Sequence, residues 1–459
     1  MSLQRPRRSW FHYAIVFSFY FGTLGCHPVA PDPQKSVSIP PGSTLRVATS
    51  GDYSPFSRWG LNEAEPSGFS VAIARAYADD RGTELDWIRF RWSELAADLE
   101  ADAFDIALSG ITVRPDRSMK GRFSLPLTTS GAVALVHEES RFEESADFEQ
   151  STIRLAVNAG GHLERVARRL FPAATILAVE DNANVLEELI QNRVDVVLTD
   201  SLEAPHWQRI AKRRLRAIGP LTRDRKAAWF PQGNTAEAER FNRWLLRAES
   251  SGQLERIRDQ YELPRGRTAN ALPALLASLD ERLTLMPAVA DAKHVLGVAT
   301  ENSQREELVL DAASLGVLRA AEDAEVEAPD SELIRRLFRS QIEAAKWIQD
   351  RRRDGLRAAA SESQTVTEDA ARAELEEVIR PALIYLGDRI SMLLIACAES
   401  PTPSFALTDV SDALERHDLP KDHVRRIYEA LAAIIQPESR SATGRSGRSA
   451  RRAAQLSIQ

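Results

Sequence analysis

Apolar residues in the first half of the chain form short runs, separated by turn residues and amphipathic segments. Three runs, at 45–49, 85–90 and 104–108, predict strands, and the segments at 69–79 and 92–99 predict helices. The pattern restarts after residue 138, with strands predicted at 153–157, 175–179 and 194–199 and helices at 160–170 and 184–191. Strands that alternate with helices are typical of a parallel sheet. The region therefore predicts two similar α/β lobes with a ligand cleft between them.

The pattern changes after residue 265. Residues 266–272 predict a linker, and beyond it strand signals disappear while apolar positions recur at helical spacing. Long helices are predicted at 274–296, 305–318, 331–357 and 368–398, with shorter ones at 410–435. The predicted fold class is a two-lobed α/β domain at 43–265, followed by an all-α domain at 273–436.

The two ends of the chain differ from its centre. Residues 1–26 predict an export signal, because arginines precede an uncharged stretch that is short for a membrane span. The stretch ends at Cys26 after Gly25, which suits lipidation of Cys26, although Thr23 departs from the usual aliphatic residue; an uncleaved anchor is the alternative. Residues 27–42 predict a proline-rich tether, and residues 437–459 a disordered basic tail.

Composition narrows the class of partner. The net charge of −7 argues against a nucleic-acid reader, which is usually basic. Of the two cysteines, Cys26 is assigned to the signal and Cys397 lies in an apolar run, so no intrachain disulfide is expected. The eight histidines show no metal-ligand spacing. We therefore expect small-molecule partners and no cofactor.

Several residues of the first half suit an anionic ligand. Arg117 follows a strand end, and a guanidinium can hold a carboxylate through two parallel hydrogen bonds. Gly160 and Gly161 open a helix whose backbone N–H groups can approach an anion. Asp200 ends a strand at the cleft and could bind an ammonium group. The alternatives are a surface salt bridge for Arg117 and a helix cap for Asp200.

Residues 45–56 and 104–112, with Gly68, Phe69, Asp116 and Arg117, resemble extracytoplasmic solute-binding proteins for polar amino acids, so the lobes are periplasmic-binding-protein-like. Residues 50–53, Gly160 and Gly161 with Glu164, residues 181–182 and residues 198–204 are similar to one branch, the periplasmic cyclohexadienyl dehydratases. Members of that branch convert prephenate to phenylpyruvate and arogenate to phenylalanine. The resemblance covers residues 43–265.

This resemblance implies roles for further residues. Glu164 would be the acid that protonates the leaving hydroxyl, Tyr53 and Trp92 would line the ring pocket, and Ser109 would join the substrate-binding set. The chain departs from the family at His162 and Leu163, where the dehydratases have Thr and Asn. It also has Ser70 and Ala72 in place of an acidic pair. Two classes stay open for this half: a dehydratase, or a binding domain without turnover.

A second set of polar residues lies in the helical region. Arg282 and Lys293 are eleven residues apart, so on one helix their directions differ by only about 20°. Arg305 follows after a short break, and Gln341, Ala345 and Gln349 share one face of a later helix. Such a set could hold a small dianion and rearrange it without a nucleophile or a metal. A solvated charged face is the alternative.

Residues 280–286, 292–293, 301–305, 338–349 and 386–389 resemble the exported all-helical chorismate mutases, over residues 272–436. The resemblance implies that Arg282 and Arg389 clamp carboxylates and that Arg305 joins the same cationic pocket. Lys293 and Gln349 would donate to the ether oxygen that breaks. Ala345 and Val309 depart from polar residues of the family. A homodimer through this domain is a further expectation.

Together these observations predict a bifunctional exported enzyme of phenylalanine biosynthesis, in which a mutase makes prephenate and a dehydratase consumes prephenate or arogenate. The alternative is a solute-binding receptor for transport or sensing, fused to a chorismate mutase.

Overall fold

The computed structural model describes residues 43–212, 214–266, 268–358, 366–399 and 405–436. These residues all fall within one of the two units into which the chain divides. The predicted export signal, Cys26, the tether and the basic tail lie outside the described residues, so those predictions stay predictions.

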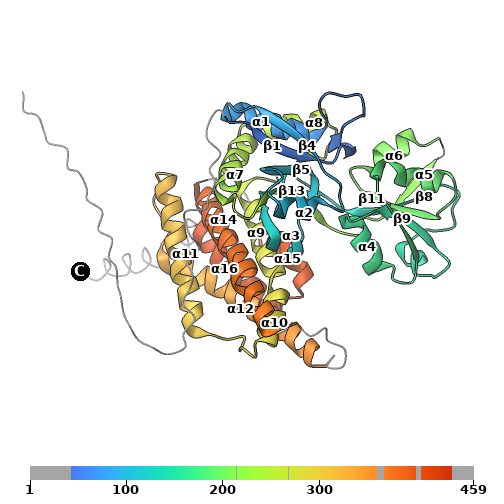
Figure 1. The fold of residues 1–459 in the computed structure, drawn as a ribbon. Helices are drawn as coiled ribbons and strands as arrows, with labels where there is room; N and C mark the ends of the chain where they lie inside the picture. Colours follow the sequence, from blue (N-terminus) through green and yellow to red (C-terminus); the bar gives the residue numbers. More distant parts are fainter. Residues whose placement is uncertain (1–42, 213, 267, 359–365, 400–404, 437–459) are drawn as a thin grey trace, which may run out of the picture. The chain divides into compact units, whose positions relative to one another are not determined.

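The first lobe is built on a mixed sheet in the order β4-β1-β5-β13-β6, with β7 also paired to β13 (Figure 1). β1 runs parallel to β4 and β5, and β13 runs antiparallel to β5 and β6. Its strands are β1 Leu45–Thr49, β4 Leu85–Arg89, β5 Ile106–Thr112, β6 Gly121–Phe123, β7 Thr128–Ser130 and β13 Asp224–Pro231, with the hairpin β2 Asp52–Tyr53 and β3 Ser57–Arg58. Its helices are α1 Phe69–Arg81, α2 Leu95–Glu100, α3 Pro115–Lys120, α7 Thr235–Ser250 and α8 Gln253–Gln260.

The second lobe has the sheet order β10-β9-β11-β8-β12. Alternate residues of β9 reach opposite faces: Leu155 and Val157 pack with α4, whereas Ala156 packs with α5 and α6. Its strands are β8 Ala132–His137, β9 Arg154–Asn158, β10 Thr175–Val179, β11 Val196–Asp200 and β12 Leu215–Ile218. Its helices are α4 His162–Leu170, α5 Val185–Ile190 and α6 Ala204–Ile210, with short 3-10 turns η2 Ser145–Phe148 and η3 Asn182–Asn184. The chain returns to the first lobe through β13, so the predicted two-lobed α/β architecture is confirmed.

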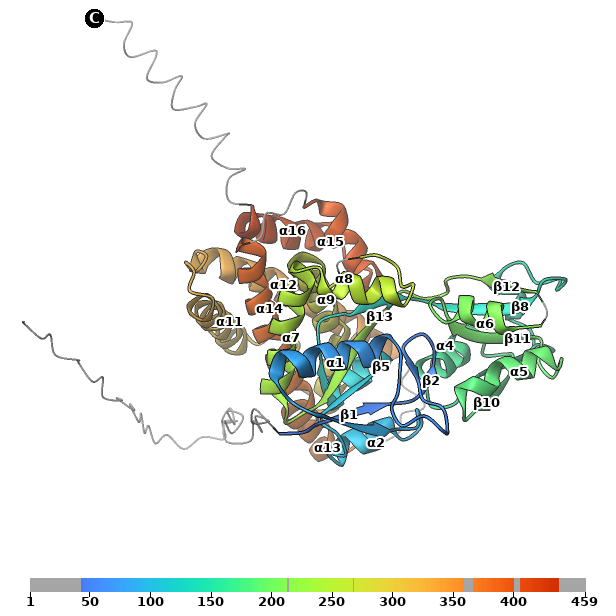
Figure 2. The ribbon, with the colours of Figure 1, turned by 90° about the horizontal axis from the view of Figure 1, so that it is seen from above.

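The remaining described residues are helical, as predicted (Figure 2). α12 packs against α10, α11 and α16, and α14 packs against α9 and α11. The helices are α9 Ala271–Thr284, α10 Met286–Val295, α11 Ser303–Asp323, α12 Ser331–Ala358, α13 Glu368–Ala373, the π-helical η4 Glu374–Ile379, α14 Arg380–Glu399, α15 Leu407–Leu414, η5 Glu415–His417 and α16 Lys421–Ile435. We call residues 43–265 the clamp and residues 271–435 the helical half.

Two predicted helices are interrupted. The helix predicted at 274–296 breaks at Leu285, because Pro287 in the first turn of α10 has no N–H to continue the ladder. The helix predicted at 368–398 contains the π-helical segment η4 just before Arg380. The continuous segment Glu368–Glu399 is long and apolar enough to cross a membrane, but 56% of its apolar window is buried inside the protein. It is therefore explained as a core helix.

Polar contacts and one apolar core join the first lobe to the helical half. Ala269, in the predicted linker, is fully buried in that core, so the segment is packed and not an open spacer. The Tyr385 hydroxyl donates to the carbonyl of Phe123 (2.8 Å), and Ser118 donates to the Glu281 carboxylate (2.8 Å). Asp280 accepts from Arg225 of β13. α9 and α14 therefore contact α3, β6 and β13 directly.

Two candidate substrate sites

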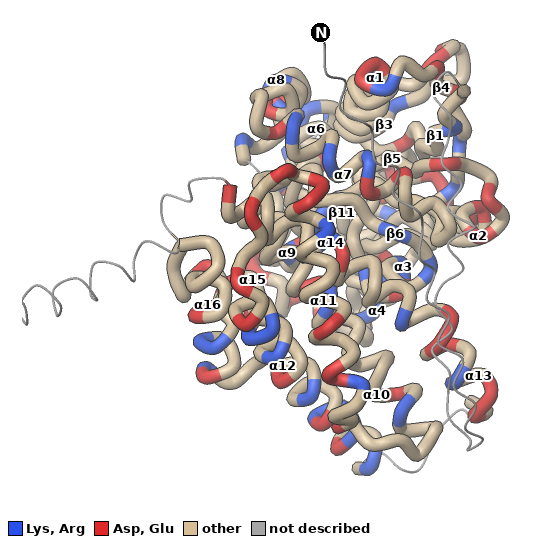
Figure 3. Tube along the Cα trace, turned by 90° about the vertical axis from the view of Figure 1, so that its left-hand side faces the viewer, with Lys and Arg blue, Asp and Glu red and all other residues tan. Residues whose placement is uncertain are grey.

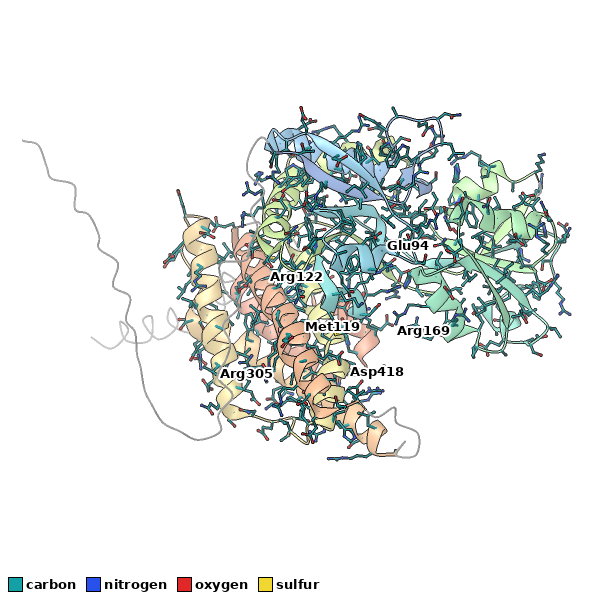
Figure 4. The ribbon with its side chains drawn as sticks, in the orientation of Figure 1. Glu94, Met119, Arg122, Arg169, Arg305 and Asp418 are labelled. Atoms are coloured by element: carbon teal, nitrogen blue, oxygen red, sulfur yellow. The ribbon has the colours of Figure 1, made fainter. Side chains whose placement is uncertain are left out.

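A cavity of about 360 Å³ lies within the helical half, between α9, α10, α11, α12, η4 and α14. We call it the helical cavity. Its polar lining includes Arg282, Lys293, Arg305, Gln349 and Arg380. Its apolar lining includes Val289, Val309, Phe338, Ile342, Leu383 and Ile384. Figure 3 shows Lys and Arg segments beside α10 and α12, and Figure 4 labels Arg305 on α11. The volume suits a small organic ligand.

Arg282 is the most enclosed cation of the helical cavity. It is 8% exposed, and burial lowers the pKa of its guanidinium to about 10. Among the described residues, its Nη1 has no hydrogen-bond partner. A buried and unpaired donor of this kind is costly unless a ligand or water satisfies it. Arg282 therefore marks an anion position.

Lys293 and Arg305 line the helical cavity near other cations. Burial lowers the pKa of Lys293, and the nearby Arg353 and Arg380 lower it further. Burial, followed by Arg380, lowers the pKa of Arg305 in the same way. A bound anion stabilises the charged form of a cation whose pKa is lowered by burial and by like charges. The cavity is therefore prepared for a ligand with more than one negative charge.

The helical cavity also contains carboxylates. Glu306 accepts from Lys346 (2.9 Å), and Arg380 pairs with Glu376 on the preceding π-helical turn. Asp388 lines the cavity, and burial raises the pKa of its carboxyl. Glu306 partly offsets the depressed pKa of Lys293, and Glu376 that of Arg305, whereas burial alone accounts for the lowered pKa of Arg282.

Gln349 brings a neutral amide to the same cavity. It is 6% exposed, and its Nε2 contacts the Met286 sulfur at 3.6 Å. Its Oε1 has no hydrogen-bond partner within the described part of the chain. Lys293 donates to the Thr300 carbonyl (2.9 Å), which orients the ammonium. Ala345 and Val309 also line the cavity, whereas Gln341 is buried outside the lining.

Arg389 is not brought to the helical cavity, which corrects the predicted carboxylate clamp. Its guanidinium pairs with Glu281 and donates to the Phe123 carbonyl (3.0 Å), in the contact with the first lobe. Arg380 lines the cavity instead. The two arginines are nine residues apart on α14, which turns them about 180° from each other. The helical phase of Leu383, Ile384 and Arg380 was the signal that could have identified Arg380.

A smaller cavity of about 30 Å³ lies between the two lobes of the clamp, and we call it the clamp cleft. Arg117 lines it, is 4% exposed and donates to the Thr112 carbonyl (3.3 Å). Burial, with the charge of Arg114, lowers the pKa of Arg117 to about 9. The neighbouring Asp116 pairs with Arg114 (2.9 Å) and Arg165 (2.8 Å). The Arg117 guanidinium is thus available to a carboxylate.

Asp200 does not present a free carboxylate to the clamp cleft, which corrects its predicted role. It is fully buried and forms an ion pair with Lys226 of β13 (2.9 Å). Ser130 donates to the same carboxylate (2.7 Å). The residue that lines the cleft is Lys226, which sequence reasoning missed. A lysine that begins the apolar run at 226–230 was the available signal.

Glu164 is held outside the cleft lining. Its carboxylate accepts from the Gly160 N–H (2.7 Å) and from Arg168 (2.7 Å). Although partial burial alone would raise the pKa of Glu164, the Gly160 and Arg168 hydrogen bonds hold it below its ordinary value. The predicted anion position at Gly160 is therefore already occupied by this side chain. Gly161 does line the cleft.

His162 lies in the cleft, where Glu164 was expected. Its Nε2 is 3.0 Å from the Asp224 carboxylate, and its buried Nδ1 has no partner among the residues described. Burial lowers the pKa of His162, and the Asp224 hydrogen bond offsets part of that effect.

The aromatic residues of the predicted set do line the clamp cleft. Tyr53 and Trp92 are in edge contact, with ring centroids 5.7 Å apart. Trp92 donates to Asp52 (3.1 Å). Ser109, in contrast, is fully buried beneath the cleft, where its hydroxyl bonds to that of Ser50 (2.8 Å). Over the described ranges, no group of three or more metal-ligating side chains converges.

The two α/β lobes and the buried arginine between them define a ligand-binding clamp. Residues 45–264 match the bacterial extracellular solute-binding proteins, family 3. A cyclohexadienyl dehydratase of Pseudomonas aeruginosa is 34% identical over 215 residues, which are 46% of this chain and 79% of that protein. The chain therefore belongs to this extracellular solute-binding family through its clamp, with a cyclohexadienyl dehydratase among its relatives.

Other relatives are binding proteins. The L-cystine-binding protein TcyJ of Escherichia coli is 24% identical over 221 residues, which are 48% of this chain and 82% of that protein. The crystal structure of AncCDT-1, an ancestral amino acid-binding protein and precursor of cyclohexadienyl dehydratase, is 28% identical. It covers 48% of this chain and 95% of its own, with a TM-score of 0.45.

Proposed function

We propose that this chain is a bifunctional enzyme whose helical half rearranges chorismate to prephenate and whose clamp converts prephenate to phenylpyruvate. The observation that carries the first activity is the helical cavity, whose lining combines Arg282, Lys293 and Arg380 with the neutral amide of Gln349. The second activity is supported by the 34% identity to a cyclohexadienyl dehydratase.

The mutase step requires no nucleophile and no proton transfer. One C–O bond breaks as one C–C bond forms, and negative charge grows on the ether oxygen. In our proposal Arg282 and Arg380 bind the two carboxylates of a compact chorismate, and Arg305 adds to the cationic field. Lys293 and Gln349 donate to the ether oxygen, which stabilises the charge of the transition state more than that of the ground state.

The dehydratase step requires an acid. Loss of CO₂ leaves its bonding electron pair to the ring as hydroxide departs, and a proton converts that hydroxide to water. The resemblance to the dehydratases implies Glu164 for this role. The geometry favours His162, because its imidazole lines the cleft while Glu164 is bonded to Arg168. Arg117 would hold a substrate carboxylate, with the ring against Tyr53 and Trp92.

The family is extracellular. Export, with lipidation at Cys26, fits the proposal but concerns residues outside the described ranges. A homodimer through the helical half stays a prediction.

Purified protein supplied with chorismate tests the proposal. Prephenate should form first and phenylpyruvate later, and chromatography would quantify each product separately. His162→Gln should let prephenate accumulate, whereas Glu164→Gln should not. Prephenate that accumulates only in Glu164→Gln would return the acid role to Glu164, and no loss of chorismate would refute the mutase.

A clamp that binds ligands without turnover is the second candidate, because the relative TcyJ of Escherichia coli is an L-cystine-binding protein. It would be favoured by ligand binding in the clamp cleft with no phenylpyruvate formed from added prephenate.

A further inference from the structure

The ion pair between Lys226 and Asp200 joins the two lobes of the clamp. Lys226 lies on β13 of the first sheet, and Asp200 ends β11 of the second. Their charged atoms are 2.9 Å apart, and the side chains are 4% and 0% exposed. Lys226 lines the cleft and Asp200 does not. At this position the cleft therefore presents the ammonium group of Lys226. Without Lys226 it would present the carboxylate of Asp200.

The surroundings of Lys226 fix this arrangement. Its Nζ also donates to the Thr112 hydroxyl (2.8 Å) and makes a long contact with the Tyr53 hydroxyl (3.4 Å). Asp200 in turn accepts from Ser130 and from the Leu202 N–H (2.9 Å). The pair is thus supported on both sides. The longest of the Lys226 contacts is to the Tyr53 hydroxyl, and Tyr53 lines the cleft. The N–H group of Lys226 that makes this contact can therefore donate to an oxygen atom of a bound ligand.

The consequence concerns the α-substituent of the ligand. An α-amino acid needs a carboxylate for its ammonium group, but the Asp200 charge is already neutralised by Lys226. To bind there, the ligand would have to approach a buried cation of like charge. An α-keto acid has no such group, and its carbonyl and carboxylate oxygens can accept from Lys226 and Arg117.

We propose that Lys226 is a specificity-determining residue, which makes the clamp select α-keto acids against the corresponding α-amino acids. The inference deepens the proposed function of the clamp, since it names prephenate and not arogenate as the substrate. The inference depends on the proposed function only for the assumption that the ligand has the carbon skeleton of prephenate. The choice between keto and amino groups follows from Lys226 and Asp200 themselves.

Calorimetric titration of the full chain with matched ligand pairs tests this selection without turnover. The first pair is phenylpyruvate and L-phenylalanine, and the second is 2-oxoglutarate and L-glutamate. The wild type should bind the keto member of at least one pair more tightly, by a factor on the order of tenfold to a hundredfold, as expected for one hydrogen bond to a charged group.

Lys226→Met removes the ammonium and leaves Asp200 free, so the preference should reverse toward the amino acid. The double variant Lys226→Met/Asp200→Asn removes both charges of the pair, so neither partner is left uncompensated, and it should lose the preference in both directions. A wild type that binds an amino acid as tightly as its keto partner, or that binds neither pair, would overturn the proposal. So would a folded Lys226→Met variant with unchanged selectivity.

The outcomes also separate this inference from the proposed reaction. A clamp that prefers keto acids but never dehydrates prephenate would refute the dehydratase and leave the role of Lys226 intact. A clamp that dehydrates prephenate and arogenate equally well would refute the role of Lys226 and leave the dehydratase intact.

Discussion

The clamp cleft and the helical cavity differ in how far their buried charged side chains are paired within the protein. In the cleft, Lys226 is paired with Asp200 and His162 with Asp224, and the volume is about 30 Å³. In the helical cavity, Arg282, Lys293 and Arg305 share about 360 Å³ with few counter-charges. The cleft satisfies most of its polar groups internally, whereas the cavity leaves cations for a ligand to satisfy.

This difference predicts which substitutions should cost the protein stability as well as function. A charge that is paired inside the protein contributes to stability, and its removal leaves a buried partner uncompensated. An unpaired cation in a cavity costs stability and is retained for binding or catalysis. Substitutions in the two kinds of environment should therefore affect different measurements.

The largest effect is expected from Arg389→Ala. Arg389 pairs with Glu281 at the buried contact between the helical half and the first lobe. Removal of one partner of a buried pair costs about 3–5 kcal/mol of unfolding free energy. Urea denaturation followed by circular dichroism would measure this loss. The double variant Arg389→Met/Glu281→Gln should recover part of it, and unchanged stability in Arg389→Ala would contradict the assignment.

Lys293→Ala should affect catalysis and not stability. Loss of one preorganised donor to a developing oxyanion raises a barrier by about 3–4 kcal/mol. The rate of chorismate loss, measured in samples quenched at fixed times, would report the change. Conversion of added prephenate by the same variant would show that the clamp is unaffected. Arg380→Ala should also slow the mutase while the denaturation midpoint stays near that of the wild type. A wild-type mutase rate in either variant would contradict the assignment of the helical cavity as the mutase site.

Hydrophobic periodicity predicted the fold class, and the family resemblances added several of the polar residues that line the two cavities. Arg282, Lys293, Arg305 and Gln349 share the cavity although Pro287 breaks the helix that was used to align the first two. The prediction that Arg389 lines the cavity was wrong, because a match to a short motif does not show which face of the helix an arginine occupies. Asp200 was misassigned because its partner comes from β13, 26 positions further along the chain, and spacing cannot reveal a pairing between lobes.

Gln349→Glu should give a smaller effect that depends on pH. The wild-type amide does not titrate, so the mutase rate should be nearly flat from about pH 5 to 7. In the variant only the protonated carboxyl can donate, and the neighbouring cations favour the carboxylate. The rate should therefore fall as pH rises, with the active range at low pH. A wild-type profile that already falls steeply in that range would mean that Gln349 does not touch the breaking bond.

The smallest effect is expected from Glu164→Gln, which should change prephenate dehydration by less than about threefold if His162 is the acid. His162 is needed protonated and its pKa is lowered by burial, so the wild-type rate should fall as pH rises through that lowered pKa. Rate profiles of His162→Gln and Glu164→Gln on prephenate would separate the two acids. If only Glu164→Gln abolished this fall in rate at rising pH, the assignment of His162 as the acid would be contradicted.

A time course of purified protein with chorismate tests the central claim most directly, with chorismate, prephenate and phenylpyruvate quantified from the same samples. The account predicts that prephenate rises and then falls as phenylpyruvate appears, that Lys293→Ala abolishes both products, and that this variant still converts added prephenate. Chorismate that persists with wild-type protein, or a Lys293→Ala variant that still makes prephenate at the wild-type rate, would contradict it.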